Sequence, residues 1–181
     1  MPRMCLNLTF DPTTEQAIQV LWSHIADAGI TERGLTKYRP HITLAVYDVE
    51  TINAYEAPLT SVASTLVPFP VLLESLGIFP EQGVIFLAPR MSHTLFSLHR
   101  ATIQAFASMN ETDQPSLVGD WLLPDRWTPH VTIAGQLTPA QVLKGLEVCL
   151  HRWAPLHGHA TGMSMRIFPE LIDYRLYPFN G

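Results

Sequence analysis

Hydrophobic and polar residues alternate over residues 4–10, as they do in a strand with one buried face. Met4, Leu6, Leu8 and Phe10 fall on one side, and Cys5, Asn7 and Thr9 fall on the other. Other apolar runs bounded by turn residues predict four more strands, over 69–79, 84–88, 161–168 and 171–177. The second and third of these five flank Pro-Glu-Gln-Gly, and the last two flank Pro-Glu, so each pair is expected to form a hairpin.

Apolar residues recur every three or four positions in four further stretches, which predicts helices. The first helix begins after Asp11 and ends near Gly29, with Trp22 in its apolar stripe. The second lies within 50–67 and the third within 91–109. The fourth begins at a capping box, Thr138-Pro-Ala-Gln, and ends before Pro155. It continues through the apolar residues Val142, Leu146, Cys149, Leu150 and Trp153.

Helices and hairpins are therefore interspersed, which indicates an α+β fold with mostly antiparallel sheets and helices on one face. No stretch is rich enough in Gly, Ser or charge to serve as a linker, so residues 1–181 are expected to form one domain. No apolar run is long enough for a membrane-spanning helix, and the N-terminus lacks the pattern of a signal peptide.

One nine-residue polar and apolar pattern occurs twice, about half the chain apart. Its copies are Lys37-Tyr-Arg-Pro-His-Ile-Thr-Leu-Ala45 and Arg126-Trp-Thr-Pro-His-Val-Thr-Ile-Ala134. Both share a basic residue, an aromatic, Pro, His, a β-branched aliphatic, Thr, an aliphatic and Ala. His-x-Thr alone is a weak signal, and the third match, at His159, has none of this context and is interpreted as background. The duplication predicts a pseudo-symmetric protein with one site between its halves.

Strand alternation then predicts which side chains meet. In the first copy Ile42, Leu44 and Val46 are expected on one face, and His41, Thr43 and Ala45 on the other. The second copy alternates in the same phase, so His130, Thr132 and Ala134 are expected to share one face, and Val131 and Ile133 the other.

Charge and cysteine content narrow the possible partners. The net charge is −5 with only 11 Lys and Arg residues, so a phosphorylated ligand is expected to be small, or to be only the end of a nucleic acid. Cys5 and Cys149 form neither a disulfide framework nor a metal motif, which favours two buried thiols in the cytoplasm. No cofactor, metal, membrane or protein partner is expected, and the chain is expected to be a monomer.

The paired His-x-Thr motifs resemble those of the 2H phosphoesterase superfamily, and most closely its 2′-5′ RNA ligase-like and cyclic nucleotide phosphodiesterase branch. The resemblance implies two pseudo-symmetric lobes, each an antiparallel sheet with helices on its outer face, enclosing a central cleft. The halves would be roughly 1–80 and 81–181, with terminal strands free to cross between lobes. It also implies that His41, Thr43, His130 and Thr132 are the catalytic residues.

The chemistry of these side chains fits opening or closing of a 2′,3′-cyclic phosphate or a 2′-5′ phosphodiester. Histidine exchanges protons near neutral pH, so two of them can serve as general acid and general base. Threonine hydroxyls two residues later, on the same face, can hold phosphate oxygens. Arg39 and Arg126 are candidates to meet phosphate and Tyr38 and Trp127 to stack on a base, with Lys37 and Arg90 as secondary candidates.

Two alternatives remain open on the sequence. The same fold could bind a nucleotide or RNA end without turning it over. His157 and His159 could instead bind a metal in a metal-dependent hydrolase, although no third ligand stands at a telling spacing.

Overall fold

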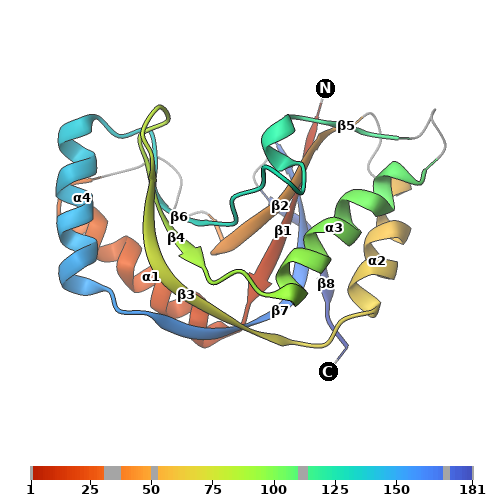
Figure 1. Cartoon of the computed structure of the whole chain (residues 1–181), viewed down its shortest axis with the longest axis horizontal. Coiled ribbons are helices and arrows are strands. Elements are labelled where there is room, and N and C mark those ends of the chain that lie inside the picture. Colours follow the sequence, from red (N-terminus) through yellow and green to blue (C-terminus); the bar gives the residue numbers. More distant parts are fainter. Residues whose placement is uncertain (1, 31–37, 50–52, 110–113, 169–171, 181) are drawn as a thin grey trace.

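The computed structural model describes residues 2–30, 38–49, 53–109, 114–168 and 172–180 (Figure 1). Its strands are β1 (Arg3–Phe10), β2 (His41–Asp48), β3 (Phe69–Phe79), β4 (Val84–Pro89), β5 (Ser116–Leu117), β6 (Val131–Ala134), β7 (Leu156–Phe168) and β8 (Ile172–Pro178). Its α-helices are α1 (Pro12–Asp27), α2 (Glu56–Ser64), α3 (His93–Ala107) and α4 (Pro139–Arg152). Two 3-10 helices are η2 (Asn53–Tyr55) and η3 (Asp120–Leu122).

All eight strands belong to one antiparallel sheet with the order β5-β2-β1-β7-β3-β4-β6, and β8 also pairs with β7. Strand β7 joins two parts of this sheet. Its first residues pair with β3, and its later residues lie between β1 and β8. In Figure 1 the strong bend of the sheet brings β2 and β6 toward each other in the middle of the molecule. The motif strands therefore face each other although neither pairs with the other in the sheet.

Helices cover the outer side of each part of the sheet (Figure 1). Helices α1 and α4 pack together beside β4 and β6, whereas α2 and α3 pack together beside β2 and β8. The α+β class, the antiparallel pairing and the outer helices confirm the expected architecture. The two lobes share a single bent sheet, because β7 is long enough to contribute to both.

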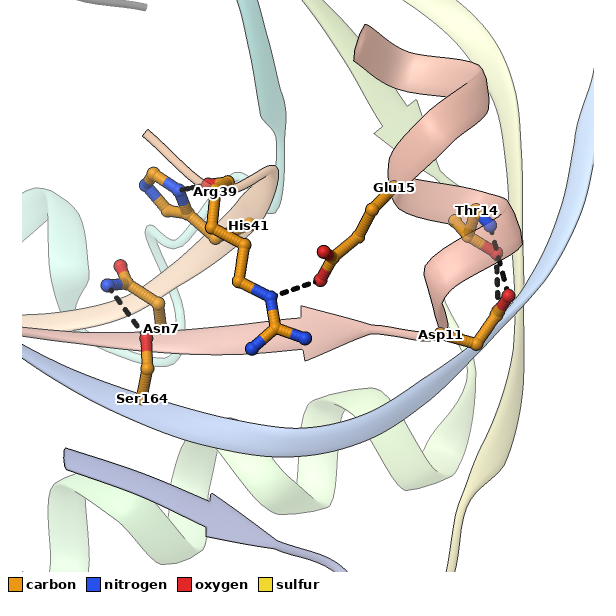
Figure 2. Close-up of polar contacts among 7 residues, drawn as sticks. All are labelled: Asn7, Asp11, Thr14, Glu15, Arg39, His41 and Ser164. Atoms are coloured by element: carbon orange, nitrogen blue, oxygen red, sulfur yellow. Dashed lines mark hydrogen bonds and ion pairs between the residues drawn. The ribbon is translucent and has the colours of Figure 1, made fainter. Parts of the chain in front are cut away.

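Local sequence explains how α1 is placed. Asp11 caps the helix by accepting a hydrogen bond from the backbone N–H of Thr14 at 3.0 Å, and Pro12 occupies the first turn (Figure 2). The same carboxylate accepts the backbone N–H of His159 at 2.8 Å, which ties the start of α1 to β7. Gly29, with φ of 76°, ends the helix in a left-handed conformation that glycine adopts at no steric cost.

The predicted fourth helix is confirmed with its capping box, in which Thr138 and Gln141 bond to each other's backbone. Leu150 continues the helix as expected, and its side chain is 74% exposed. The expected loop at 110–125 contains β5 and η3 among its described residues. Strand β7 begins at Leu156 rather than at residue 161, so it includes His157 and His159. The predicted turn at 169–170 lies outside the described residues.

Strand β1 is buried on both faces. Met4, Leu6, Leu8 and Phe10 are completely inaccessible in the core, as the alternation predicts. The opposite face is polar but equally covered, since Asn7 is 0% and Thr9 is 3% exposed. A buried carboxamide needs hydrogen-bond partners, so this second face points to a polar site rather than to further core.

None of the described helices is both long and apolar enough to span a membrane.

Candidate active site at the two His-x-Thr motifs

Both motif strands contain a β-bulge immediately after the threonine. On β2, Thr43 lies opposite Asn7 and Ala45 lies opposite the next residue, Leu6, so Leu44 is the extra residue. On β6, Thr132 lies opposite Phe86 and Ala134 lies opposite Ile85, so Ile133 is the extra residue. The two copies therefore share an irregularity of the backbone as well as a sequence pattern.

The bulges correct the expected faces of the two alanines. Ala45 and Ala134 were expected beside the histidines, but each bulge reverses the alternation after the threonine. Both alanines are completely buried with the core, and Val46 is only partly buried against it for the same reason. His41 and Thr43 remain together on one face of β2, which is the part of the expectation that matters for a site.

The two histidines make equivalent hydrogen bonds. His41 Nδ1 lies 2.7 Å from the carbonyl oxygen of Arg39, and His130 Nδ1 lies 2.8 Å from that of Thr128. A carbonyl can only accept, so each Nδ1 carries the hydrogen, and the Nε2 of a neutral ring keeps its lone pair. Each ring is thereby held in the form that can take a proton at Nε2.

The carbonyl oxygens of the two threonines each accept an indole N–H. Trp127 Nε1 donates to Thr43 at 3.0 Å, and Trp22 Nε1 donates to Thr132 at 3.0 Å. The first of these bonds also links the segment before β6 directly to β2. The two motifs are therefore connected by side chains as well as by the bend of the sheet.

A polar row lies behind the first motif. Thr43, Asn7 and Ser164 stand side by side on β2, β1 and β7, as the strand register requires. The Thr43 hydroxyl donates to Asn7 Oδ1 at 3.5 Å, and Asn7 Nδ2 donates to Ser164 Oγ at 3.5 Å. Cys5 Sγ donates to the same Asn7 oxygen at 3.1 Å. Asn7 is thus the centre of the buried polar contacts beneath Thr43.

Arg39, a predicted phosphate ligand, is paired with a carboxylate. Figure 2 shows its side chain extending toward Glu15 on α1, to which its Nε donates, while the His41 ring turns the other way. Glu15 is largely covered, and burial raises the pKa of its carboxyl, an effect that the Arg39 guanidinium partly offsets. The charge of Arg39 is therefore already engaged beside His41.

The second motif is surrounded by aromatic rings. Phe79 meets the His130 ring edge-on with centroids 4.9 Å apart, and the Phe86 centroid lies at 5.3 Å. Phe86 can lie there because Gly77, opposite it on β3, has no side chain: a Cβ at Gly77 would stand 2.2 Å from the Phe86 ring. Burial lowers the pKa of His130, although its bond to the Thr128 carbonyl opposes the shift. The neutral form of the His130 ring is therefore favoured.

One pocket of about 390 Å³ joins the two motifs. Thr43 and His130 line it, whereas His41 and Thr132 stand outside its lining as the described residues form it. The volume falls within the usual range for small-ligand sites. The remaining walls are mainly aromatic and polar side chains, namely Phe79, Gln82, Trp121, Leu122, Arg126, Trp127 and Thr128.

The other predicted binding residues are placed differently from one another. Arg126 lines the pocket and pairs with Asp120 at 3.3 Å, in an exposed contact of the kind that binds weakly. Trp127 also lines the pocket, but it is only 8% exposed, and its ring stacks on His99 at 3.9 Å. The Tyr38 ring lies 4.9 Å from the guanidinium carbon of Arg166 on β7. Of the secondary candidates, Arg90 donates from Nη2 and Nε to the two carboxylate oxygens of Glu74, at 2.6 and 2.8 Å. Lys37 lies outside the described residues.

Several residues around the site were missed by the sequence reasoning. Trp121 is 54% exposed at the pocket, and an aromatic residue within a polar loop was a signal that could have indicated it. Phe79 and Gln82 sit at the hairpin that sequence predicted, without any sign that it would reach His130. Asn7 carried a usable signal, since it is an amide in the middle of a predicted strand.

The metal alternative finds no support around His157 and His159. Both side chains are exposed on β7. Within the described parts of the chain, no three His, Cys, Asp or Glu side chains gather closely enough to hold a metal ion.

Comparison with known proteins gives a consistent result. The family model described as the 2′-5′ RNA ligase superfamily matches residues 10–167. Among solved structures, TT0787 of Thermus thermophilus superposes with a TM-score of 0.65 at 16% identity, covering 99% of this chain and 98% of that one. E. coli LigT complexed with 3′-AMP superposes with a TM-score of 0.61 at 15% identity, covering 99% and 95%. E. coli LigT complexed with ATP gives 0.59 at 14%, covering 99% and 96%. No curated protein sequence matched the chain.

The structural likenesses, at such low identity, speak for the fold alone. The family match extends over most of the chain and includes both His-x-Thr motifs. The chain therefore belongs to the 2′-5′ RNA ligase superfamily of 2H phosphoesterases.

Proposed function

We propose that this protein is a metal-independent phosphodiesterase of the 2H type, acting on 2′,3′-cyclic phosphates or 2′-5′ linkages of small nucleotides or RNA ends. The observation that carries the proposal is the repeated geometry of the two motifs. In each, a histidine held through Nδ1 precedes a threonine at a bulge, and one pocket is lined by Thr43 and His130. Membership of the superfamily supports the same reaction class.

In the proposed reaction His130 is the base and His41 the acid during hydrolysis. The aromatic surroundings of His130 lower its pKa and favour the neutral ring, whose Nε2 takes a proton from water. The water oxygen bonds to phosphorus, the bond from phosphorus to one ribose oxygen breaks, and His41 supplies that oxygen with a proton. When a 5′-hydroxyl takes the place of water, the same step forms a 2′-5′ linkage and the histidines keep their roles. In the reverse direction the freed ribose hydroxyl bonds to phosphorus, the bond from phosphorus to the 5′ oxygen breaks, and the two histidines exchange roles.

The hydroxyls of Thr43 and Thr132 hold the phosphate oxygens in this proposal. The Thr43 hydroxyl has one hydrogen, which it directs at Asn7 in the free protein across 3.5 Å. Such a long bond is weak, so the hydrogen can turn to a phosphate oxygen at little cost. Donors aimed at the charge that develops on phosphate are the main electrostatic aid to phosphoryl transfer.

Substrate binding is proposed to use the pocket walls. Trp121 offers an exposed ring on which a base can stack, and Gln82 offers an amide for its polar edge. Among the described residues, Arg126 is the cation that lines the pocket and is proposed to meet phosphate, with Trp127, Tyr38 and Arg39 as supporting residues. E. coli LigT has been crystallised with 3′-AMP, NADP+ and ATP, which supports a small nucleotide as ligand here.

The test compares His41→Ala and His130→Ala with the unchanged protein on 2′,3′-cyclic AMP and on 2′-5′ dinucleotides. We expect each substitution to reduce kcat by about a thousandfold, because each removes one general acid–base partner. Circular dichroism serves as the folding control, and activity is also measured after dialysis against EDTA. Full activity in either variant, or activity lost only on chelation, would show the proposal to be wrong. Binding of 2′-AMP without any turnover would instead favour a non-catalytic nucleotide-binding module.

A further inference from the structure

Each motif threonine receives its indole hydrogen bond from the other half of the chain. Trp22, near the N-terminus, donates to Thr132, which lies 110 residues later. Trp127, just before the second motif, donates to Thr43, which lies 84 residues earlier. The exchange is therefore reciprocal, and it takes place at the two positions where the bulges begin.

The sheet explains why these carbonyl oxygens need a donor from elsewhere. Within the described residues, β5 pairs with β2 only at Tyr47 and Asp48, and β6 ends the strand order. Neither motif threonine therefore has a second neighbouring strand. A bulge disturbs the ladder further, and a covered carbonyl without a donor is unfavourable. The indole N–H groups replace the donors that a neighbouring strand would supply.

Both indoles are fixed in place. Trp22 is 8% exposed within the apolar stripe of α1, and Trp127 is 8% exposed with its ring parallel to that of His99, at an interplanar angle of 3°. A fixed indole fixes the peptide plane that it bonds. The direction of the threonine side chain depends on the same backbone, so holding the carbonyl also aims the hydroxyl.

We infer that Trp22 and Trp127 are positioning residues for phosphodiester chemistry, whose N–H groups hold the two bulges so that the hydroxyls of Thr132 and Thr43 meet the phosphate. The inference rests on the proposed function, because it requires the threonines to contact phosphate. Trp22 is the cleaner case, since it stands outside the pocket lining. It acts through Thr132 rather than on the substrate.

The first experiment replaces each tryptophan with phenylalanine, which keeps a ring and removes the N–H. The matched control is Trp153→Phe, because Trp153 Nε1 is buried without a hydrogen-bond partner among the described residues. We expect Trp22→Phe to lower kcat on 2′,3′-cyclic AMP by about tenfold with KM nearly unchanged, as misplaced groups do. Trp153→Phe should leave kcat unchanged, even if it lowers the thermal midpoint of unfolding as far as Trp22→Phe does. Equal kcat in all three variants and the unchanged protein would overturn the inference.

Paired substitutions test the assignment of each indole to its threonine. In a Thr132→Ala background, Trp22→Phe should cause no further loss of kcat, because the hydroxyl that it positions is gone. In a Thr43→Ala background, Trp22→Phe should still lower kcat by its full factor of about ten. Trp127→Phe should cause no further loss of kcat in the Thr43→Ala background, and should lower kcat further in the Thr132→Ala background. Equal losses in both backgrounds would mean that the tryptophans act through general stability only.

A spectroscopic measurement gives an answer that does not depend on turnover. In ¹⁵N-labelled protein titrated with inorganic phosphate, the Nε1–H signals of Trp22 and Trp127 should shift, and that of Trp153 should stay. Unmoved Trp22 and Trp127 signals on saturation would contradict the inference. If the threonine variants strongly lower turnover while the Trp22 and Trp127 variants match Trp153→Phe, the proposed function stands and only the positioning role fails. If Thr43→Ala and Thr132→Ala keep full turnover, the proposed function itself is wrong.

Discussion

The two His-x-Thr motifs share their backbone geometry but differ in what lies behind them. Thr43 stands opposite Asn7, with Ser164 beyond it, whereas Thr132 stands opposite Phe86. The same bulge, histidine bond and indole bond are thus set against a polar wall in one half and an aromatic wall in the other. In the proposed reaction the equal geometry holds one phosphate, and the unequal surroundings make one histidine the base and the other the acid.

The largest effect expected from this comparison is loss of either threonine hydroxyl. Thr43→Val and Thr132→Val should each lower kcat by about a hundredfold, because each removes one donor to the phosphate. Only Thr43→Val should also lower the free energy of unfolding, by about 1 kcal/mol or less, since Asn7 loses a partner and Phe86 does not. Steady-state kinetics and urea unfolding measure the two quantities.

Thr161→Val is the control for that pair, because Thr161 belongs to the third His-x-Thr, which lacks the shared context. It should leave kcat unchanged. Equal destabilisation by Thr43→Val and Thr132→Val would break the proposed contrast between a polar and an aromatic wall.

Sequence patterns predicted the strands other than β5 and the first residues of β7, together with the capped fourth helix and the paired motifs, because these follow from local periodicity. The bulges escaped prediction, since Ile42 to Val46 alternate perfectly in sequence and only the partner strand reveals the extra residue. The roles of Trp22 and Phe79 escaped for another reason. Both look like core residues in sequence, and their contacts with Thr132 and His130 arise only when distant segments meet.

The next effect concerns His99, which supports the first motif through Trp127. Burial lowers the pKa of His99 to about 4 from an ordinary value of 6.5. Below pH 6.5 the unfolded chain therefore takes up a proton that the folded chain refuses, so stability is complete above that pH and is lost as the pH falls toward 4. His99→Phe, which keeps a ring against Trp127, should reduce the loss of unfolding free energy between pH 7 and 4.5 by about 2 to 3 kcal/mol.

Urea unfolding at the two pH values gives that difference, with His151→Phe as the control because this ring is exposed. An unchanged difference in the His99 variant would mean that another group causes the acid sensitivity.

A smaller effect is expected when the aromatic wall is opened. Burial among Phe79 and Phe86 lowers the pKa of His130, so its neutral imidazole, the proposed base, persists to lower pH. Phe79→Gln should raise that pKa toward its ordinary value and move the acidic limb of the kcat/KM profile to higher pH, with several-fold loss on the acidic side. Phe79→Leu keeps the site apolar and should leave the limb in place. If Phe79→Gln leaves the acidic limb in place, that limb belongs to a group other than His130. The base role would then pass to His41.

The smallest effect tests the polar wall at its far end. Ser164 is 1% exposed and accepts from Asn7 at 3.5 Å, a length at which a hydrogen bond contributes little. Ser164→Ala leaves the Asn7 Nδ2 without that acceptor, so the free energy of unfolding should fall by about 1 kcal/mol or less, measured by urea unfolding. Asn7 also accepts from Cys5, and therefore should keep its oxygen toward Thr43, with kcat unchanged. If Ser164→Ala lowers kcat as far as Thr43→Val does, the side-chain amide of Asn7 has rotated and its oxygen no longer faces Thr43. The row from Ser164 to Thr43 then controls the hydroxyl directly, and the two halves differ in mechanism as well as in surroundings.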